Sequence, residues 1–143
     1  MKSCIFCKIL NQEVAAEMVY RDQDAAVFLD HRPLFPGHLL VVPTSHIQTL
    51  PELPPDQVPR LFGVVQKMAE AVPIACQAQG TFVALNNKVS QSVPHLHVHV
   101  VPRSKKDGLR GFFWPRNPYR DEQHKRDTAE AIRQALSSLG VQP

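Results

Sequence analysis

One segment of the chain, residues 93–103, reads Val93-Pro94-His95-Leu96-His97-Val98-His99-Val100-Val101-Pro102-Arg103. Successive side chains of a β-strand point to opposite faces of its sheet. We therefore expect His95, His97 and His99 to line one face of a strand, while the apolar residues between them pack into a core on the other. Neighbouring imidazoles repel one another when protonated, so packing alone gives little reason to place three of them together. The pattern favours a functional site on the histidine face.

The composition is that of one globular domain with a substantial core, because 43% of the 143 residues are hydrophobic and 20% are charged. The formal net charge is only +3, and the basic residues are scattered or confined to residues 103–110 and 116–126. This distribution fits a small anionic ligand better than duplex DNA, so no stable nucleic-acid complex is expected. Residues 1–10 contain no apolar run of signal-peptide length, and no segment has the apolar length of a membrane span. We expect a cytoplasmic protein without membrane association.

The three cysteines are an odd number, and in a reducing compartment they are expected as thiols or thiolates. Cys4 and Cys7 have the CxxC spacing that brings two sulfurs to one metal ion. A redox pair and two buried apolar cysteines are the alternatives. Cys76 falls late in a helical pattern and is expected in the core.

Regular elements are predicted from the apolar periodicity and the turn residues. We expect a turn with a short helix at 4–10, a β-hairpin at 17–20 and 25–29, a strand at 39–43, a helix whose first turn contains Pro55-Asp56 and which Pro73 ends or kinks, a strand at 81–85, and a helix at 121–139.

Two loops contain candidate site residues. The loop 30–38 contains two prolines and a glycine and leads into a strand, so Asp30 and His38 are candidates; a turn cap and a solvated loop histidine are the alternatives. The loop 86–92 is polar and leads into the histidine segment, where it can direct amide and hydroxyl groups toward the imidazoles. The segment 108–116 contains glycines, arginines and three aromatic residues, and it is either core filler or a mobile strip over a partner or ligand.

The histidine segment resembles the alternating signature of the histidine triad (HIT) superfamily, with Gln91-Ser92-Val93 at the family's Gln-Ser/Thr-Val step. The CxxC pair, the loop 30–38, the turn 43–46 and Asn86 follow in the family's order. The chain looks like the bacterial Hint/Fhit-like branch of nucleotide hydrolases and transferases. This resemblance implies an α+β fold, with a five-stranded antiparallel sheet and a long helix, paired as a homodimer. It also implies a HIT domain at 1–107 and a C-terminal extension with the aromatic segment and a helical tail at 108–143.

The resemblance further implies that the chain cleaves nucleotide conjugates at the α-phosphate. His97 would attack phosphorus and form a nucleotidyl-histidine intermediate, which water or another acceptor resolves. His99 and His38 would hold the phosphate, and Ser92 would pass a proton near the leaving group. The expected nucleotide-binding residues are Asp30 for the ribose, with Asn86, Gln91 and His99 for phosphate or ribose.

In zinc-bearing members the corresponding ligands are Cys4, Cys7, His46 and His95. Four protein ligands close a tetrahedron and leave no position for an activated water, so this zinc would be structural. A catalytic zinc held by the three strand imidazoles is the rival, and it leaves the CxxC pair unexplained.

Two function classes stay open, and two segments depart from the family pattern. One class is an enzyme acting on dinucleoside polyphosphates or nucleoside phosphoramidates; the other is a nucleotide-binding or protein-docking dimer with little or no catalysis. The loop 87–90 is shorter than usual, which affects the leaving-group side of the pocket. The segment after Arg103 has no close family match.

Overall fold

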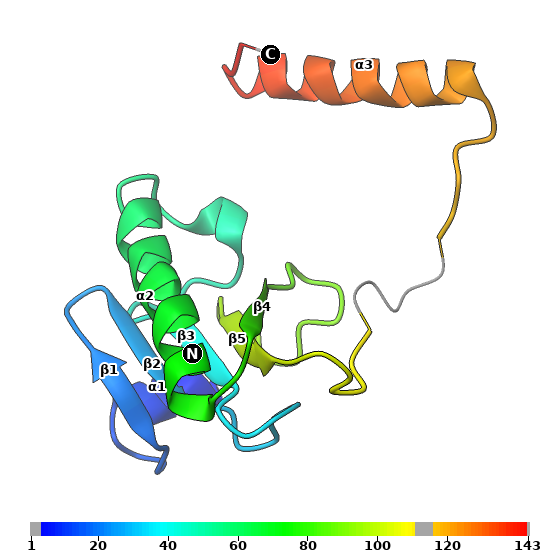
Figure 1. The fold of residues 1–143 in the computed structure, drawn as a ribbon. Coiled ribbons are helices and arrows are strands. Elements are labelled where there is room, and N and C mark those ends of the chain that lie inside the picture. Colours follow the sequence, from blue (N-terminus) through cyan, green and yellow to red (C-terminus); the bar gives the residue numbers. More distant parts are fainter. Residues whose placement is uncertain (1–3, 111–115, 143) are drawn as a thin grey trace. The chain divides into compact units, whose positions relative to one another are not determined.

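The structure is a computed structural model that describes residues 4–110 and 116–142. The chain divides into two compact units, Met1–Asp107 and Gly108–Pro143. The first unit has a five-stranded antiparallel sheet with a long helix, α2, and a short helix, α1 (Figure 1). The predicted α+β fold class is therefore confirmed. The aromatic residues 112–114, for which a partner-facing strip is one prediction, lie outside the described residues.

The sheet has the strand order β1-β2-β3-β5-β4, and every neighbouring pair is antiparallel. This order places β5 between β3 and β4, with His99 opposite Leu40 on one side and Ala84 on the other. The bounds are α1 (Ile5–Leu10), β1 (Met18–Arg21), β2 (Ala25–Leu29), β3 (Leu39–Pro43), a 3-10 turn (Leu50–Glu52), α2 (Val58–Cys76), β4 (Gly80–Ala84), β5 (Val98–Arg103) and α3 (Glu122–Ser138).

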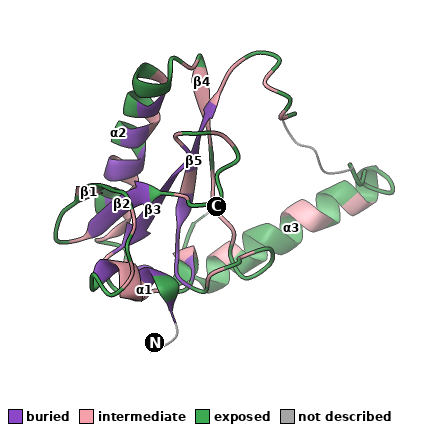
Figure 2. Cartoon of the chain, turned by 90° about the horizontal axis from the view of Figure 1, so that it is seen from below, coloured by how far each residue is buried: buried purple, intermediate pink, exposed green. Residues whose placement is uncertain are grey.

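Both faces of the central strands are buried, and they pack against different helices (Figure 2). Alternate residues of a strand point to opposite faces, so Val27 and Val41 face α2, whereas Phe28 and Leu40 face α1. Leu61, Val65 and Val72 are among the α2 residues that complete the first core; Phe6 and Leu10 of α1 complete the second. This division explains why β2 and β3 read as continuous apolar runs in the sequence.

The strand β5 begins at Val98, so His95 and His97 precede it and the prediction of one strand carrying all three histidines is wrong in its start. The reason lies in the backbone: Val41 and Val98 are the last pair between β3 and β5, and the Leu96 N–H donates to the Ile47 carbonyl at 2.7 Å rather than to β3. The ring of His95 donates from Nε2 to the Pro43 carbonyl at 2.9 Å, which takes the place of a backbone donor. The alternation still holds, because Leu96, Val98 and Val100 lie in the α2 core.

The long helix differs from its prediction at both ends. It begins at Val58 rather than with Pro55-Asp56, since residues 55–57 form a turn closed by the Gln57 N–H on the Pro54 carbonyl. It continues past Pro73 and ends at Cys76, followed by Gln77 in the left-handed region. Cys76, which the sequence predicts in the core, is exposed, because it lies in the last turn beyond the buried stripe.

The second unit contains α3, whose N-terminus is capped by the Asp121 carboxylate accepting from the His124 N–H at 2.7 Å. The predicted helix at 121–139 is confirmed within one residue at each end. None of its residues is buried, and Ile132 and Leu139 of the predicted apolar face are exposed. Within the described residues, no helix has both the length and the apolar character needed to span a membrane.

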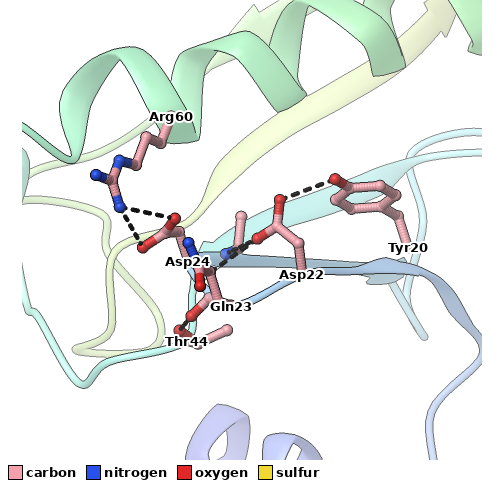
Figure 3. Close-up of polar contacts among 7 residues, drawn as sticks. Tyr20, Asp22, Gln23, Asp24, Thr44 and Arg60 are labelled. Atoms are coloured by element: carbon pink, nitrogen blue, oxygen red, sulfur yellow. Dashed lines mark hydrogen bonds and ion pairs between the residues drawn. The ribbon is translucent and has the colours of Figure 1, made fainter.

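The turn between β1 and β2 is held by one carboxylate (Figure 3). Asp22 Oδ1 accepts from the backbone N–H groups of Asp24 and Ala25 at 2.8 and 2.7 Å, and its Oδ2 accepts from the Tyr20 hydroxyl at 2.8 Å. The Ala25 N–H is the main reason why the pKa of Asp22 lies below its ordinary value. Arg60 of α2 binds the neighbouring Asp24 at 3.1 Å and ties the turn to the helix.

We expect Asp22→Ala to lower the free energy of unfolding by about 1–3 kcal/mol, because it leaves the N–H of the fully buried Ala25 without its acceptor. Asp22→Asn keeps an oxygen at the same place and should cost clearly less. Urea unfolding followed by circular dichroism measures both, and equal losses in the two variants would contradict this role.

Candidate functional site

Four of the predicted site residues meet on the α1 face of the sheet. His97 directly precedes β5, His99 is the second residue of β5, Asp30 directly follows β2, and His38 directly precedes β3. The ring centroids of His97 and His99 are 5.0 Å apart, and those of His38 and His99 are 5.1 Å apart. His38 is only 3% exposed, so it is not a solvated loop residue.

The hydrogen bonds fix which nitrogen of each ring carries a proton. The Leu34 backbone N–H donates to His38 Nδ1 at 3.1 Å, so Nδ1 is an acceptor and a neutral His38 carries its proton on Nε2. That Nε2–H faces His99 Nδ1 at 2.9 Å. His99 Nδ1 is therefore the acceptor, and a neutral His99 has its proton on Nε2. This relay presents His99 as a hydrogen-bond donor.

His97 has the opposite arrangement. Its Nδ1 lies 2.7 Å from the carbonyl oxygen of His95, which can only accept a hydrogen bond, so Nδ1 carries the proton. The Nε2 lone pair is therefore available. Phe6 packs edge-on against the His97 ring, with centroids 5.2 Å apart, and restricts its orientation. Adjacent rings thus offer a lone pair at His97 and a donor at His99, the combination needed to attack and stabilise one phosphorus centre.

Asp30 has two roles at once. Its Oδ1 accepts from the Arg32 N–H at 2.9 Å, the turn-capping role that the sequence leaves open. Its Oδ2 lies 3.7 Å from His38 Nε2, and the residue also lines the pocket. A carboxylate here can accept hydrogen bonds from hydroxyl groups of a ligand.

A pocket of about 650 Å³ opens in front of His97 and His99. We call it the nucleotide pocket, after the ligand that the family resemblance predicts for it. Besides the two histidines, its polar lining residues are Glu17, Asp30, His31 and Ser92; Glu17 and His31 were not predicted from the sequence. Much of its wall is apolar and comes from α1, the connection that follows α1, the strands β2 and β3, and the segment before His95: Ile5, Phe6, Ile9, Val14, Ala15, Ala16, Phe28, Leu29, Leu40 and Val93. This apolar wall was not predicted from the sequence. The spacing of Ile5 and Ile9, four residues apart on one side of a helix, indicates a part of it.

The side chains of the other two predicted nucleotide-binding residues, Asn86 and Gln91, form hydrogen bonds within the chain. Asn86 Nδ2 donates to the Ser90 carbonyl at 3.2 Å, and Gln91 Nε2 donates to the Gln48 carbonyl at 2.6 Å. Gln91 Oε1 also accepts from the Lys88 N–H at 2.8 Å. Neither amide lines the nucleotide pocket. Both side chains therefore hold the loop 86–91, and a contact of either one with a nucleotide stays a prediction.

A second cluster lies beside this pocket and contains Cys4, Cys7, His46 and His95. One potential ligand atom from each residue lies within 4.8 Å of the others. His95 Nδ1 is 3.5 Å from Cys4 Sγ and 3.6 Å from Cys7 Sγ, and Cys7 Sγ is 3.3 Å from His46 Nδ1. We call these four residues the metal cluster.

The geometry of the metal cluster fits zinc. Bonds of the usual zinc–sulfur and zinc–nitrogen lengths in a tetrahedron separate sulfur and nitrogen by about 3.5 Å. The hydrogen bond from His95 Nε2–H to the Pro43 carbonyl leaves Nδ1 as the lone-pair atom facing the sulfurs. The His97 and His99 rings are absent from this cluster, so the three strand histidines do not converge on one point as the rival catalytic site requires.

Burial lowers the pKa of His38 and, with the nearby His97 and His38 rings, lowers the pKa of His99 to about 4. Asp30 opposes both shifts. Both imidazoles are therefore neutral near neutral pH, consistent with the single shared proton between them. A neutral His99 can donate to a phosphate without a charge.

We expect the protein to lose stability as the pH falls from about 6.5 to about 4. In this window the unfolded His99 binds a proton while the folded one does not, so the unfolded state gains protons and is favoured. His99→Gln, whose amide oxygen can still accept from His38, should show a shallower decline of the thermal midpoint. Both proteins retain the same metal cluster, and parallel pH profiles would contradict the assignment.

The chain is similar to proteins of one known family. The HIT domain family matches residues 11–106. An uncharacterized HIT-like protein of Methanocaldococcus jannaschii is 39% identical over 106 residues, which cover 73% of this chain and 82% of that protein. A crystal structure from Streptococcus mutans superposes with a TM-score of 0.85 at 34% identity, covering 95% of this chain and 87% of that one.

Three similar proteins have names that describe a bound metal or an activity. A zinc-bound histidine triad protein from Mycobacterium smegmatis has a TM-score of 0.72 at 35% identity, covering 96% of this chain and 98% of that one. A bis(5'-nucleosyl)-tetraphosphatase of Schizosaccharomyces pombe is 33% identical over 66% of this chain and 53% of its own length. An Arabidopsis thaliana adenylylsulfatase is 33% identical over 74% and 55%. The family match and these identities show that the chain belongs to the HIT family.

Proposed function

We propose that this protein cleaves nucleotide conjugates at the α-phosphate through a nucleotidyl-histidine intermediate on His97. The observation that carries the proposal is the hydrogen bond from His97 Nδ1–H to the His95 carbonyl, which leaves Nε2 as a lone pair in the nucleotide pocket. The relatives named as a tetraphosphatase and an adenylylsulfatase support it, because both names describe enzymes that act on nucleotide conjugates.

In the first step, His97 Nε2 donates its electron pair to the α-phosphorus, and the bond from phosphorus to the leaving group breaks. The electron pair of that bond goes to the leaving group, which takes a proton through the Ser92 hydroxyl. In the second step, water attacks phosphorus and releases its proton to the solvent, the bond from phosphorus to Nε2 breaks, and its electron pair returns to Nε2. His99 Nε2–H stabilises the phosphate oxygens in both steps, and His38 holds His99 in the donor tautomer.

The nucleoside would occupy the rest of the nucleotide pocket. The apolar wall from α1 suits the faces of a nucleobase, and Asp30 suits the ribose hydroxyls. Asn86 and Gln91 would act indirectly, by fixing the loop that presents Ser92.

The main alternative is a nucleotide-binding or protein-docking dimer with little catalysis. The exposed apolar residues of α3 are the feature that favours docking. The homodimer itself stays a prediction of the family resemblance. The complementary states of His97 and His99 favour the enzyme, since binding a phosphate requires donors and not a lone pair.

We expect His97→Ala to reduce turnover of an adenosine phosphoramidate by several orders of magnitude, with little change in adenosine monophosphate affinity, because the covalent step is lost. His38→Ala should cost less, on the order of a hundredfold, because it removes only the residue that orients His99. Added imidazole should partly restore His97→Gly. His124→Ala, in α3, is the matched control and should stay active. Near-normal turnover in His97→Ala would refute the assignment.

We also propose that the metal cluster holds one structural zinc. Two thiolates and two imidazoles are the ligand types that zinc favours, and four protein ligands leave no position for a reacting water. The zinc would supply no chemistry to the reaction; it would fix Cys4 and Cys7, and thereby α1, against the histidine segment.

Elemental analysis should find about one zinc per chain, and a strong chelator should lower the thermal midpoint. Cys7→Ser should lose most of the zinc, whereas Cys76→Ser, which changes an exposed cysteine outside the cluster, should keep it. If the purified protein contained no zinc and the chelator left its thermal midpoint unchanged, the proposed zinc site would be excluded.

A further inference from the structure

A second pocket, of about 330 Å³, adjoins the nucleotide pocket. Ile5, Ser92 and Val93 line both pockets, so a ligand can extend from one into the other. The remaining wall of the second pocket consists of Gln48 and Pro94, with Cys4 and His46 of the metal cluster. We call it the metal-side pocket. The function proposed above leaves it without a role.

His97 lies between this pocket and the far end of the nucleotide pocket. On one side of His97, the His99 ring is 5.0 Å away and is bonded in turn to His38. On the other side, the Phe6 ring is 5.2 Å from His97 and 5.8 Å from His95, which belongs to the metal cluster. A conjugate with its nucleoside at the Asp30 end and its phosphorus at His97 therefore continues toward the metal-side pocket.

The described lining of the metal-side pocket contains no permanently charged side chain. None of the described residues that line it is a lysine, an arginine or a carboxylate, and a zinc held by two thiolates and two neutral imidazoles has no net charge. A polyphosphate leaving group carries several negative charges and favours arginine or lysine. The side-chain amide of Gln48 and the apolar surfaces of Ile5, Val93 and Pro94 suit an uncharged organic group instead.

We infer that the metal-side pocket binds the leaving group, that it favours an uncharged organic moiety over a polyphosphate, and that Gln48 is a specificity-determining residue. This inference rests on the proposed function. When the leaving group is an amine, the phosphorus–nitrogen bond breaks, the electron pair stays on nitrogen, and the nitrogen takes a proton through Ser92. The amine then departs through the metal-side pocket, away from the nucleotide bound to His97.

The side chain of Gln48 can be changed without disturbing the loop 86–91, because Gln91 bonds the backbone carbonyl of Gln48 and not its amide. The residue is also exposed, which permits a larger side chain. We expect Gln48→Trp to fill the pocket and to exclude bulky leaving groups. Gln66→Trp makes the same change at an exposed glutamine of α2, which packs on the opposite face of the sheet.

The test compares two adenosine phosphoramidates, one unsubstituted and one of benzylamine. Gln48→Trp should lower the ratio of kcat/KM for the benzylamine conjugate to that for the unsubstituted one by about tenfold or more. Gln66→Trp should leave the ratio unchanged. Gln48→Phe is a smaller replacement that should shift the ratio in the same direction if the tryptophan variant does not fold. An unchanged ratio in a folded variant would overturn the inference.

A charge substitution tests the neutrality of the pocket. Gln48→Lys should raise kcat/KM for diadenosine tetraphosphate several-fold relative to the benzylamine conjugate at low salt, and salt should reduce the gain. No gain would exclude the pocket as the leaving-group site. Wild-type protein that cleaves neither phosphoramidate nor tetraphosphate would instead refute the proposed function, so the two failures are distinguishable.

Discussion

A neutral imidazole has one donor nitrogen and one acceptor nitrogen, so a backbone group bonded to one nitrogen sets the role of the other, and this constraint orders the imidazoles on the α1 face of the sheet. His38, His95 and His97 are each less than 5% exposed. Each has one nitrogen bonded to the backbone: His38 to the Leu34 amide, His95 to the Pro43 carbonyl and His97 to the His95 carbonyl. The backbone partner thus determines which nitrogen of each ring carries the proton and which nitrogen can bind a metal, a neighbouring ring or a ligand. The outcome differs from one ring to the next.

The sheet separates the tasks of stability and function. The aliphatic core fills its α2 face, and its α1 face holds the nucleotide pocket together with Cys4 and Cys7. Because neighbouring residues of β2 and β3 serve opposite faces, a substitution at Val27 or Val41 acts on the core and one at Phe28 or Leu40 acts on the site wall. Changes in stability and in ligand specificity can therefore arise at adjacent positions of the same strand.

Most of the strands were predictable, since apolar runs bounded by turn residues are local signals, and a row of histidines marks a candidate site in the same local way. The start of β5 was not predictable, because it depends on the hydrogen bond from the Leu96 N–H to the Ile47 carbonyl and on the bond between the His95 ring and Pro43. The position of the proton on each imidazole was not predictable either, because it depends on hydrogen-bond partners that only the folded structure brings together. The backbone hydrogen bonds of Asn86 and Gln91 were not predictable either, because an amide in a loop reads the same whether it contacts a substrate or the backbone.

The helix α1 has only six residues, fewer than an isolated helix needs to be stable in water. Its order must come from its surroundings, namely the Phe6 contact with Phe28 and the two cysteines at its start and in its middle. Ile5, Phe6 and Ile9 on the same helix form part of the nucleotide pocket. Local unfolding of this one turn and a half would abolish ligand affinity while the α2 core stayed intact. The rate at which α1 opens, rather than the rate of global unfolding, would then set the lifetime of the binding-competent state.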